Sequence, residues 1–413
     1  MRRVPLRRVF EVVNGGTPTS EPENWDGDIP WATPIDLGRV NGGRIAETQR
    51  TLTSEGLRIG SSKVPAGSLV LSTRAPIGYV AETTASMAFN QGCRGLTPRT
   101  EVDIRYFRYQ LLMAAEQLQA RGQGSTFVEL STDNLASFPV VVPRLAEQRA
   151  IADYLDAETA RIDSLVAHRG RQLELLRARR RAEIRAAVVG ADLAREHVLD
   201  RGEGWPPRAL PSGWRLVPVR YVSRVTRGAS PRPIDDPSYF DDDGEYSWVR
   251  ISDVTANGHY LEHTGQRLSE LGASKSVKLE PGRLILSIAA SVGTATLTRI
   301  RCCIHDGFVC FDDLRGVTPE YLYYVFSAGT MFEGLGKLGT QLNLNTDTIG
   351  NIRVPAPPLE RQEAIVSLLD AGARRASALS DDMSRQIDLL LERRQALITA
   401  AVTGQLEIPG IAA

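Results

Sequence analysis

The feature that most constrains this chain is one long segment that occurs twice. Residues 143–190 align without a gap with residues 357–404, so that Gln148 corresponds to Gln362 throughout a constant register. In both copies apolar residues recur at alternating steps of four and three, a spacing typical of a helix with an apolar seam. The sequence therefore predicts a duplicated chain in which each half ends in a long helix.

We expect the two helices to pack against each other. A helix of about 45 residues is roughly 65 Å long, too long for its apolar stripe to be buried inside one small domain. An antiparallel pair solves this, and the alternative is two separate surface helices. The predicted interface residues are Ile151, Leu155, Ile162, Leu165 and Leu176 in the first helix and Ile365, Leu369, Leu379, Met383, Leu390 and Leu397 in the second.

The segments that precede the two helices also repeat, with looser identity. Short runs such as 68–72 and 139–142 are typical of strands, turn signals separate them, and residues 104–112 have a helical pattern. Pro34 interrupts one expected strand. Shared anchors recur in the same order in both halves, among them Trp31 and Trp248, which we expect in the core. Residues 44–63 and residues 260–278, by contrast, share little sequence identity.

These observations predict an α+β fold with an internal pseudo-twofold repeat. Two mixed α/β domains would be separated by two long helices packed as an antiparallel coiled coil. The expected boundaries are a first domain at 1–142, a central helix at 143–190, a linker at 191–213, a second domain at 214–356, a C-terminal helix at 357–404 and a tail at 405–413.

Composition narrows the class of protein without identifying a partner. The 413 residues include 45 Arg and 4 Lys, but the formal net charge is zero, so overall charge predicts neither nucleic-acid nor membrane binding. The longest apolar runs are shorter than a membrane span. We therefore expect a cytoplasmic protein.

The sequence offers no catalytic or metal-binding signature. Phosphate-loop and dinucleotide-binding glycine patterns are absent, and the four cysteines lack metal-ligand spacing. Acidic runs at 235–236 and 241–243 lie in a proline-rich segment, and we interpret them as solvated or helix-capping loops. We expect no catalysis, no metal site and no cofactor in this chain.

The order of motifs, occurring twice, resembles the specificity subunit (HsdS) of type I restriction–modification systems. Each long helix opens with a P-x-L-x-x-Q motif that ends at Gln148 and Gln362. Each preceding domain carries a G-x-T/S-P motif at 15–18 or 228–231, an aromatic-centred strand, a G-x-L/I-L-S strand and a late G-[ST]-[TQ] turn. The resemblance spans essentially the whole chain.

This resemblance implies a function in DNA recognition. Each of the two domains would be a target-recognition domain that reads one half of a bipartite, asymmetric sequence in double-stranded DNA. The helix pair would set the spacing and dock two methyltransferase subunits that hold S-adenosylmethionine, and restriction (motor-nuclease) subunits would join them. Two other interpretations remain open: a coiled-coil scaffold whose heads bind proteins without reading DNA, and a self-sufficient enzyme with an unrecognised active site.

Candidate DNA contacts follow from the side chains that read base edges, carried on loops. For each of them a purely structural role is equally compatible with the sequence. The candidates are Thr17, Thr19, Ser20, Arg74, Asn90, Gln91, Ser125 and Thr126 in the first domain and Ser230, Arg232, Arg250, His305, Thr340, Gln341 and Asn343 in the second.

Overall fold

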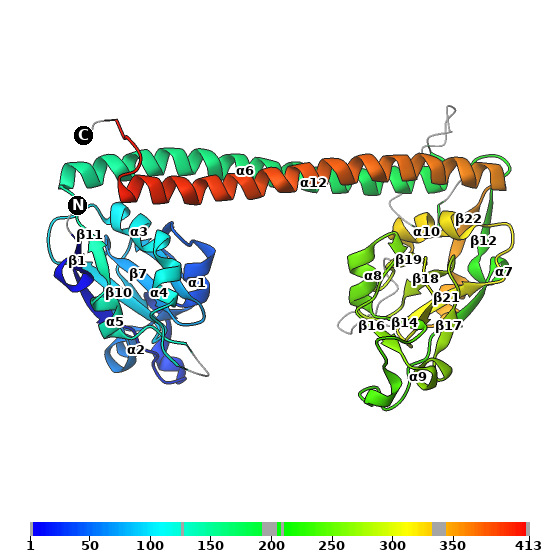
Figure 1. Cartoon of the computed structure of the whole chain (residues 1–413), viewed down its shortest axis with the longest axis horizontal. Coiled ribbons are helices and arrows are strands. Elements are labelled where there is room, and N and C mark those ends of the chain that lie inside the picture. Colours follow the sequence, from blue (N-terminus) through cyan, green and yellow to red (C-terminus); the bar gives the residue numbers. More distant parts are fainter. Residues whose placement is uncertain (1–2, 125–127, 192–204, 208–209, 333–343, 410–413) are drawn as a thin grey trace. The chain divides into compact units, whose positions relative to one another are not determined.

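The computed structural model of the chain describes residues 3–124, 128–191, 205–207, 210–332 and 344–409. The chain divides into two compact units (Figure 1). Unit 1 comprises Met1–Gly170 and Ser384–Ala413, and unit 2 comprises Arg171–Met383. Each unit therefore contains one globular head together with a part of each long helix.

The head of unit 1 is a strand-rich domain with short helices. Expected segments at 68–72, 104–112 and 139–142 are confirmed as β7, α3 and β11. Its strands are β1 (Arg3–Pro5), β2 (Phe10–Asn14), β3 (Trp25–Ala32), β4 (Arg44–Ile45), β5 (Thr51–Leu52), β6 (Ser62–Val64), β7 (Leu69–Thr73), β8 (Ile77–Thr83), β9 (Met87–Phe89), β10 (Cys93–Pro98) and β11 (Pro139–Val141). Its helices are η1 (Leu6–Arg8), η2 (Pro22–Asn24), α1 (Pro34–Arg39), α2 (Ser54–Gly60), α3 (Ile104–Met113), α4 (Ala115–Gln119) and α5 (Thr132–Ala136).

Three sheets build this head. A five-stranded sheet has the order β2-β10-β7-β8-β4, a four-stranded sheet the order β5-β3-β9-β6, and β1 pairs with β11. Most neighbours are antiparallel, but β4 runs parallel to β8 and β3 parallel to β9. Apolar residues from the five-stranded sheet and from α3 share one core.

Pro34 marks the end of a strand and the beginning of a helix. Strand β3 ends at Ala32, and Pro34 occupies the first turn of α1, where its missing N–H costs no hydrogen bond. The Thr33 side chain accepts from the Asp36 amide, and the Asp36 carboxylate accepts from the Thr33 amide at 3.0 Å. The proline is therefore compatible with an intact strand and a capped helix.

The head of unit 2 repeats this topology element by element. Its strands are β12 (Arg215–Pro218), β13 (Arg224–Arg227), β14 (Tyr246–Val249), β15 (Tyr260–Leu261), β16 (Gln266–Leu268), β17 (Val277–Leu279), β18 (Leu284–Ser287), β19 (Ala295–Thr298), β20 (Cys302–Ile304), β21 (Phe308–Asp312) and β22 (Arg353–Ala356). Its helices are α7 (Val219–Val222), η3 (Pro237–Tyr239), α8 (Ile251–Asn257), α9 (Glu270–Ser274), α10 (Pro319–Ser327), η4 (Thr330–Phe332) and α11 (Thr346–Asn351). The sheet orders β13-β21-β18-β19-β15 and β16-β14-β20-β17 match those of unit 1.

The two long helices are α6 (Leu145–Val189) and α12 (Leu359–Thr403). In unit 1, Ile151 near the start of α6 shares a core with Ile398 near the end of α12. In unit 2, Val188 near the end of α6 shares a core with Ile365 near the start of α12. The pairing is therefore antiparallel within each unit, as expected.

Both long helices end at a glycine in the left-handed conformation. Gly190 has φ +72° and Gly404 has φ +75°. The next amide folds back onto the last helical turn in each case, from Ala191 to Ala186 and from Gln405 to Ala400, both at 2.9 Å. This geometry satisfies free carbonyl groups at a helix end and favours glycine there.

A buried glutamine joins each long helix to its head. Gln148 accepts a hydrogen bond from the Asp103 amide at 3.0 Å and donates to the Pro143 carbonyl at 2.9 Å. Gln362 accepts from the Thr318 amide at 2.8 Å and donates to the Pro357 carbonyl at 2.8 Å. Since Asp103 and Thr318 are the N-caps of α3 and α10, the glutamine of the P-x-L-x-x-Q motif has a structural role.

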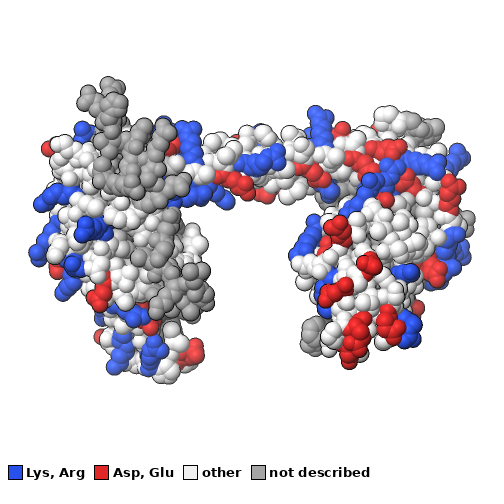
Figure 2. Space-filling model, turned by 180° about the vertical axis from the view of Figure 1, so that it is seen from behind, with Lys and Arg blue, Asp and Glu red and all other residues white. Residues whose placement is uncertain are grey.

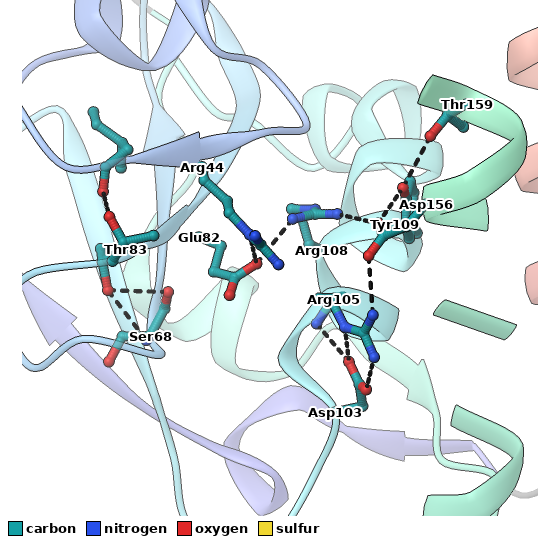
Figure 3. A network of polar contacts seen from close by, with 12 residues as sticks. Arg44, Ser68, Glu82, Thr83, Asp103, Arg105, Arg108, Tyr109, Asp156 and Thr159 are labelled. Atoms are coloured by element: carbon teal, nitrogen blue, oxygen red, sulfur yellow. Dashed lines mark hydrogen bonds and ion pairs between the residues drawn. The ribbon is translucent and has the colours of Figure 1, made fainter. Parts of the chain in front are cut away.

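An aspartate on each long helix makes the second joint. In unit 1, the Tyr109 hydroxyl and the Arg108 guanidinium both contact Asp156, at 2.7 and 2.9 Å (Figure 3). In unit 2, the Tyr324 hydroxyl donates to the corresponding residue, Asp370, at 2.5 Å. Together, the glutamine and aspartate contacts fix the same register between head and helix in both units.

Candidate nucleic-acid interface

The G-x-T/S-P motif follows strand β2 or β13 and packs against the loop between β9 and β10 or between β20 and β21. A Cβ atom on Gly15 would lie 1.9 Å from the Asn90 carbonyl oxygen, and one on Gly228 would lie 2.2 Å from the His305 carbonyl oxygen. Only glycine permits an approach this close. The motif therefore brings two loops that are distant in sequence into one cluster in each head.

In unit 1 the centre of this cluster contains the candidates Thr17, Asn90 and Gln91. The Thr17 hydroxyl donates to the Gln91 side-chain oxygen. Asn90 uses its side-chain oxygen to accept from the Gly92 amide at 3.0 Å, which closes the turn that carries Gln91. Thr17 and Gln91 are exposed and Asn90 is half-buried, so the cluster presents hydroxyl and amide groups to solvent.

Arginine side chains border the same cluster. Arg94 donates to the Gln91 carbonyl at 2.8 Å and pairs with Glu129 at 3.4 Å. The candidate Arg74 lies 4.0 Å from Glu129 and is half-buried. Its guanidinium stem lies beside Gly92, where an added Cβ would come within 3.1 Å of the Arg74 Nε. Arg74 therefore belongs to the cluster of Thr17, Asn90 and Gln91.

Thr19 and Ser20 continue the glycine–proline loop, and their exposed side chains differ in their contacts. The Thr19 hydroxyl accepts from the Asn24 amide at 2.9 Å, and its carbonyl accepts from the Trp25 indole at 2.9 Å. These bonds give Thr19 a structural role in addition to any contact with a ligand. Ser20 is exposed at the tip of the loop.

In unit 2 the corresponding cluster centres on Asp306. The Ser230 hydroxyl donates to one carboxylate oxygen at 2.9 Å, and the Arg232 guanidinium donates to the other at 3.0 Å. Partial burial of Asp306 opposes its ionisation, but the Ser230 hydroxyl and the Arg232 guanidinium outweigh this and hold the Asp306 pKa below its ordinary value. The cluster thus holds an ionised carboxylate where unit 1 holds an amide.

His305 and Arg250 complete the cluster of unit 2. The Nδ1 atom of His305 accepts from the Gly307 amide at 2.8 Å. Burial lowers the His305 pKa, and this effect exceeds the opposing effect of the Asp306 carboxylate. Arg250 is exposed at the end of β14, donates to the Gln266 side chain and also lowers the His305 pKa. The described candidates Ser230, Arg232, Arg250 and His305 therefore lie together.

Five candidates, Ser125, Thr126, Thr340, Gln341 and Asn343, lie outside the described residues. The predicted anchors Trp31 and Trp248 are confirmed in the core, with 4% and 2% of their surface exposed. On the face drawn in Figure 2, basic and acidic side chains are interspersed over each unit. This distribution agrees with the zero formal net charge of the chain.

Comparisons with known proteins decide the family. The profile described as "Type I restriction modification DNA specificity domain" matches residues 2–175 and again residues 211–387. The chain belongs to this DNA specificity family. The double match also confirms the internal repeat expected from the sequence.

Individual relatives match parts of this DNA specificity chain. The MjaIX specificity subunit of Methanocaldococcus jannaschii is 33% identical over 41% of this chain and 40% of its own length. The EcoR124I/EcoR124II specificity subunit of Escherichia coli is 26% identical over 41% of this chain and 44% of its own length. The chain thus spans well under two thirds of these relatives.

One solved structure supports the fold over nearly the full length. A chain from the structure described as "Structural basis underlying complex assembly and conformational transition of the type I R-M system" has a TM-score of 0.75. It is 18% identical, and 98% of each chain is covered. This likeness supports the α+β architecture with two heads and two long helices.

Sequence reasoning missed several polar residues of the two clusters. Asp306 occupies the position that corresponds to Gln91, because Asn90-Gln91-Gly92 aligns with His305-Asp306-Gly307. A strict comparison of the two repeats would have revealed it. Arg227, which donates to the Asp306 carbonyl at 2.7 Å, and Arg94 carried no comparable signal.

The predicted helix-pair residues of this specificity chain differ in burial. Leu165 and Leu379 are 47% and 44% exposed. The residues Ile151, Leu155, Ile162, Ile365 and Leu369 are buried, and Leu176, Met383, Leu390 and Leu397 are half-buried. Ile184, Val188, Ile398 and Val402 are buried although they lie off the predicted seam, because the helix ends also pack against the heads.

Within the described residues, no group of three or more potential ligands could hold a metal ion. The acidic runs have capping contacts: Asp236 accepts from the Ser238 amide and Asp241 from the Asp243 amide. All four cysteines are buried and unpaired, and burial raises the pKa of Cys93 and of Cys302 to about 12. None of the helices in this described part is long and apolar enough to cross a membrane.

Proposed function

We propose that the chain is the DNA specificity subunit of a type I restriction–modification complex. Each head would read one half of a bipartite, asymmetric target in double-stranded DNA. The observation that supports this most directly is the double match to the DNA specificity domain, combined with one loop cluster at the same place in each head.

The two clusters carry different side chains on the same frame. Unit 1 presents Thr17, Gln91 and Arg74, whereas unit 2 presents Arg232 and Arg250 beside the carboxylate of Asp306. Arginine pairs with guanine, amides pair with adenine, and carboxylates accept from cytosine. Different residues on equivalent loops would read different bases, which supports an asymmetric target.

The long helices would set the distance between the two half-sites. Turns of B-DNA repeat about every 34 Å along the duplex, so a change in helix length would select a different spacing. We expect that inserting one heptad into α6, with a matched heptad in α12, lengthens the unspecified spacer and leaves both half-sites unchanged.

Catalysis would reside in partner subunits. Two methyltransferase subunits, each holding S-adenosylmethionine, would dock at the helices and heads, and restriction subunits would add cleavage. A zero net charge is compatible with this arrangement, since partners can supply many of the phosphate contacts. The complex would act on DNA in the cytoplasm.

The decisive experiment is methylation mapping in cells with and without this chain. We expect one bipartite motif to lose methylation when the chain is deleted. Exchanging residues 1–142 for the matching domain of another specificity subunit should change only one half of that motif. Unchanged methylation after deletion, together with no sequence-selective DNA binding by the purified complex, would contradict the proposal and favour a protein-binding scaffold.

A further inference from the structure

The joints between head and helix can be compared residue by residue because they share one frame. The glutamines 148 and 362 bind the N-caps of α3 and α10, and Tyr109 and Tyr324 bind the aspartates at 156 and 370. This register makes Arg105 of α3 correspond to Glu320 of α10. The two units therefore carry opposite charges at one position of the joint.

In unit 1, Arg105 fills the space between α3 and α6. Its guanidinium lies 2.7 Å from Asp103 and 3.0 Å from Asp156 (Figure 3). It also lies 2.7 Å from Asp153. The side chain is 21% exposed. A cation supplied by the head itself therefore neutralises the carboxylates of the helix.

In unit 2 the same place is an open pocket. Its volume is about 480 Å³. Polar and charged side chains from the start of α10 and from the first third of α12 line it, including Thr318, Glu320, Glu363, Ser367, Asp370 and Arg374. The carboxylate at position 370 is retained, but the guanidinium that would contact it is replaced by Glu320.

A second charge reversal strengthens the contrast. Position 149 of unit 1 is an arginine that pairs with Glu101 at 3.1 Å, whereas the corresponding residue of unit 2 is Glu363. His259 lies 3.9 Å from Asp370, but burial lowers its pKa to about 4, so it is uncharged near neutral pH. Among the residues that line the pocket, three carboxylates therefore face one guanidinium, that of Arg374.

We infer that the pocket of unit 2 receives an arginine or lysine side chain from a protein partner. The ligand class is set by unit 1, where Asp156 already holds a guanidinium at the equivalent site. A metal ion is a poorer fit, since no ligand group for one occurs in the described chain. The identity of the partner rests on the proposed function, which makes it a methyltransferase subunit.

This inference makes the two joints unequal as docking sites. Unit 1 presents a site that its own Arg105 has closed. Unit 2 presents an open pocket lined by more carboxylates than guanidinium groups, with Arg180 of α6 close by, donating to the Leu369 carbonyl. If two identical partner subunits bind, the basic side chain of a subunit can therefore enter the pocket only at unit 2.

The charge of the pocket can be tested on the full chain without any partner. Ser367→Cys places a thiol at the exposed rim of the pocket, and the four native cysteines are buried. We expect a cationic methanethiosulfonate (trimethylammonium-ethyl) to react about ten times faster than an anionic one (sulfonatoethyl) at low salt, after normalisation to free cysteine. Adding Glu320→Gln should reduce this ratio severalfold.

The matched control is Ser164→Cys, an exposed serine on α6, where both reagents should react at similar normalised rates. Equal rates for the thiol introduced at position 367, or a ratio that Glu320→Gln leaves unchanged, would overturn the inference. This measurement is independent of DNA recognition, so its outcome and that of the proposed function are separable.

The partner is tested with the assembled complex. Glu320→Arg should place a guanidinium beside Asp370, as Arg105 does beside Asp156, and so close the pocket. We expect binding of the methyltransferase subunit at unit 2 to weaken at least about tenfold, so that native mass spectrometry shows one bound subunit in place of two. Glu392→Arg, at an exposed position of α12, is the charge-matched control and should bind normally.

The second readout is protection of the thiol at position 367 from the reagents in the complex. In the complex of the Ser367→Cys chain, the thiol should react at least about tenfold more slowly than in the free chain. If Glu320→Arg binds like the parent chain and the thiol stays reactive in the complex, no basic side chain enters the pocket. If the parent chain binds no methyltransferase subunit, the proposed function fails, while the reagent-rate ratio still decides the charge of the pocket.

Discussion

The two heads have the same strands in the same order, yet they stabilise their joints with different chemistry. In unit 1, Arg108 pairs with Glu82 at 2.9 Å and with Asp156 at 2.9 Å. In unit 2, the corresponding region stacks His259 between Tyr260 and Tyr323, with ring centroids 4.1 and 3.9 Å apart. An ion-pair network and an aromatic stack thus support one topology.

Comparison of the two joints shows which contacts between head and helix are common to both units. Gln148 and Gln362 bind peptide groups in both units, and Tyr109 and Tyr324 both bind an aspartate. The residues around these contacts have diverged in charge and aromaticity. Two kinds of contact are therefore common to both joints, one from the glutamine and one to the aspartate, and the surrounding side chains are free to acquire separate roles.

The largest effect should follow from placing a charge in either joint. Leu155 is fully buried in the core of unit 1, and Leu369 is 2% exposed in the core of unit 2. Replacing either with Asp removes apolar burial and buries a carboxylate, which should cost at least about 4 kcal/mol. We expect hydrogen exchange to rise in the unit that carries the change. Leu165→Asp, at a 47% exposed position, is the control, and equal exchange in all three variants would contradict the comparison.

Removing the glutamine of either joint should have the next largest effect. Gln148→Leu abolishes two hydrogen bonds, and Gln362→Leu abolishes three, including one to the Gly316 carbonyl at 2.8 Å. Each orphaned buried group costs about 1–3 kcal/mol, so unit 2 should lose more stability than unit 1. Urea unfolding measures this, with the exposed Gln395→Leu as control. A larger loss in unit 1 would contradict the ranking by number of hydrogen bonds.

Mild acid should destabilise unit 2 more than unit 1, because unit 2 contains His259. Its pKa is lowered from 6.5 to about 4, chiefly by burial, so the folded state binds a proton less readily than the unfolded state. The contribution of neutral His259 to the free energy of unfolding is present in full above pH 6.5. It is lost as the pH falls toward 4, by about 2 kcal/mol between pH 7 and pH 5. Hydrogen exchange at the two pH values should show unit 2 weakening first. His259→Phe should remove most of this pH dependence, and a variant that keeps it would disprove the assignment to His259.

The smallest effects should arise in the loop clusters. Thr17→Ala removes the bond to Gln91, and Ser230→Ala removes the bond to Asp306. Each should weaken DNA binding by about 1 kcal/mol for targets that retain the matching half-site. The base preference at the other half-site should not change. Competition binding with oligonucleotides altered in one half measures this, and Ser164→Ala on α6 is the control. A change at both halves in either variant would break the assignment of one head to one half-site.

The repeat made most of the fold predictable. The ungapped match of 143–190 with 357–404 predicted both long helices to within two residues of their ends. Residues 44–63 and 260–278 share little sequence, yet each contains two short strands, a helix and the start of a third strand in the same order. The corresponding strands β5 and β16 each end in a buried leucine, Leu52 or Leu268.

Individual contacts were harder to predict because they depend on close approach between distant segments. Gly15 and Gly228 were evident as motif residues, but the carbonyl groups that they contact come from loops roughly 75 residues away. Likewise, Gln148 was recognised as a family signature, whereas its bond to the Asp103 amide depends on the register of α3 against α6. Side-chain partners across such distances require the assembled fold.

The glutamine joints have a consequence for how such chains can change. Gln148 and Gln362 contact only main-chain groups, namely an N-cap amide and carbonyls that any head of this topology supplies. These main-chain contacts do not depend on the side chains of the attached head, whereas the contact at Asp156 or Asp370 needs a tyrosine hydroxyl from the head. A different head of this topology could therefore be joined to either helix, provided that it keeps this tyrosine at the equivalent position of its own helix.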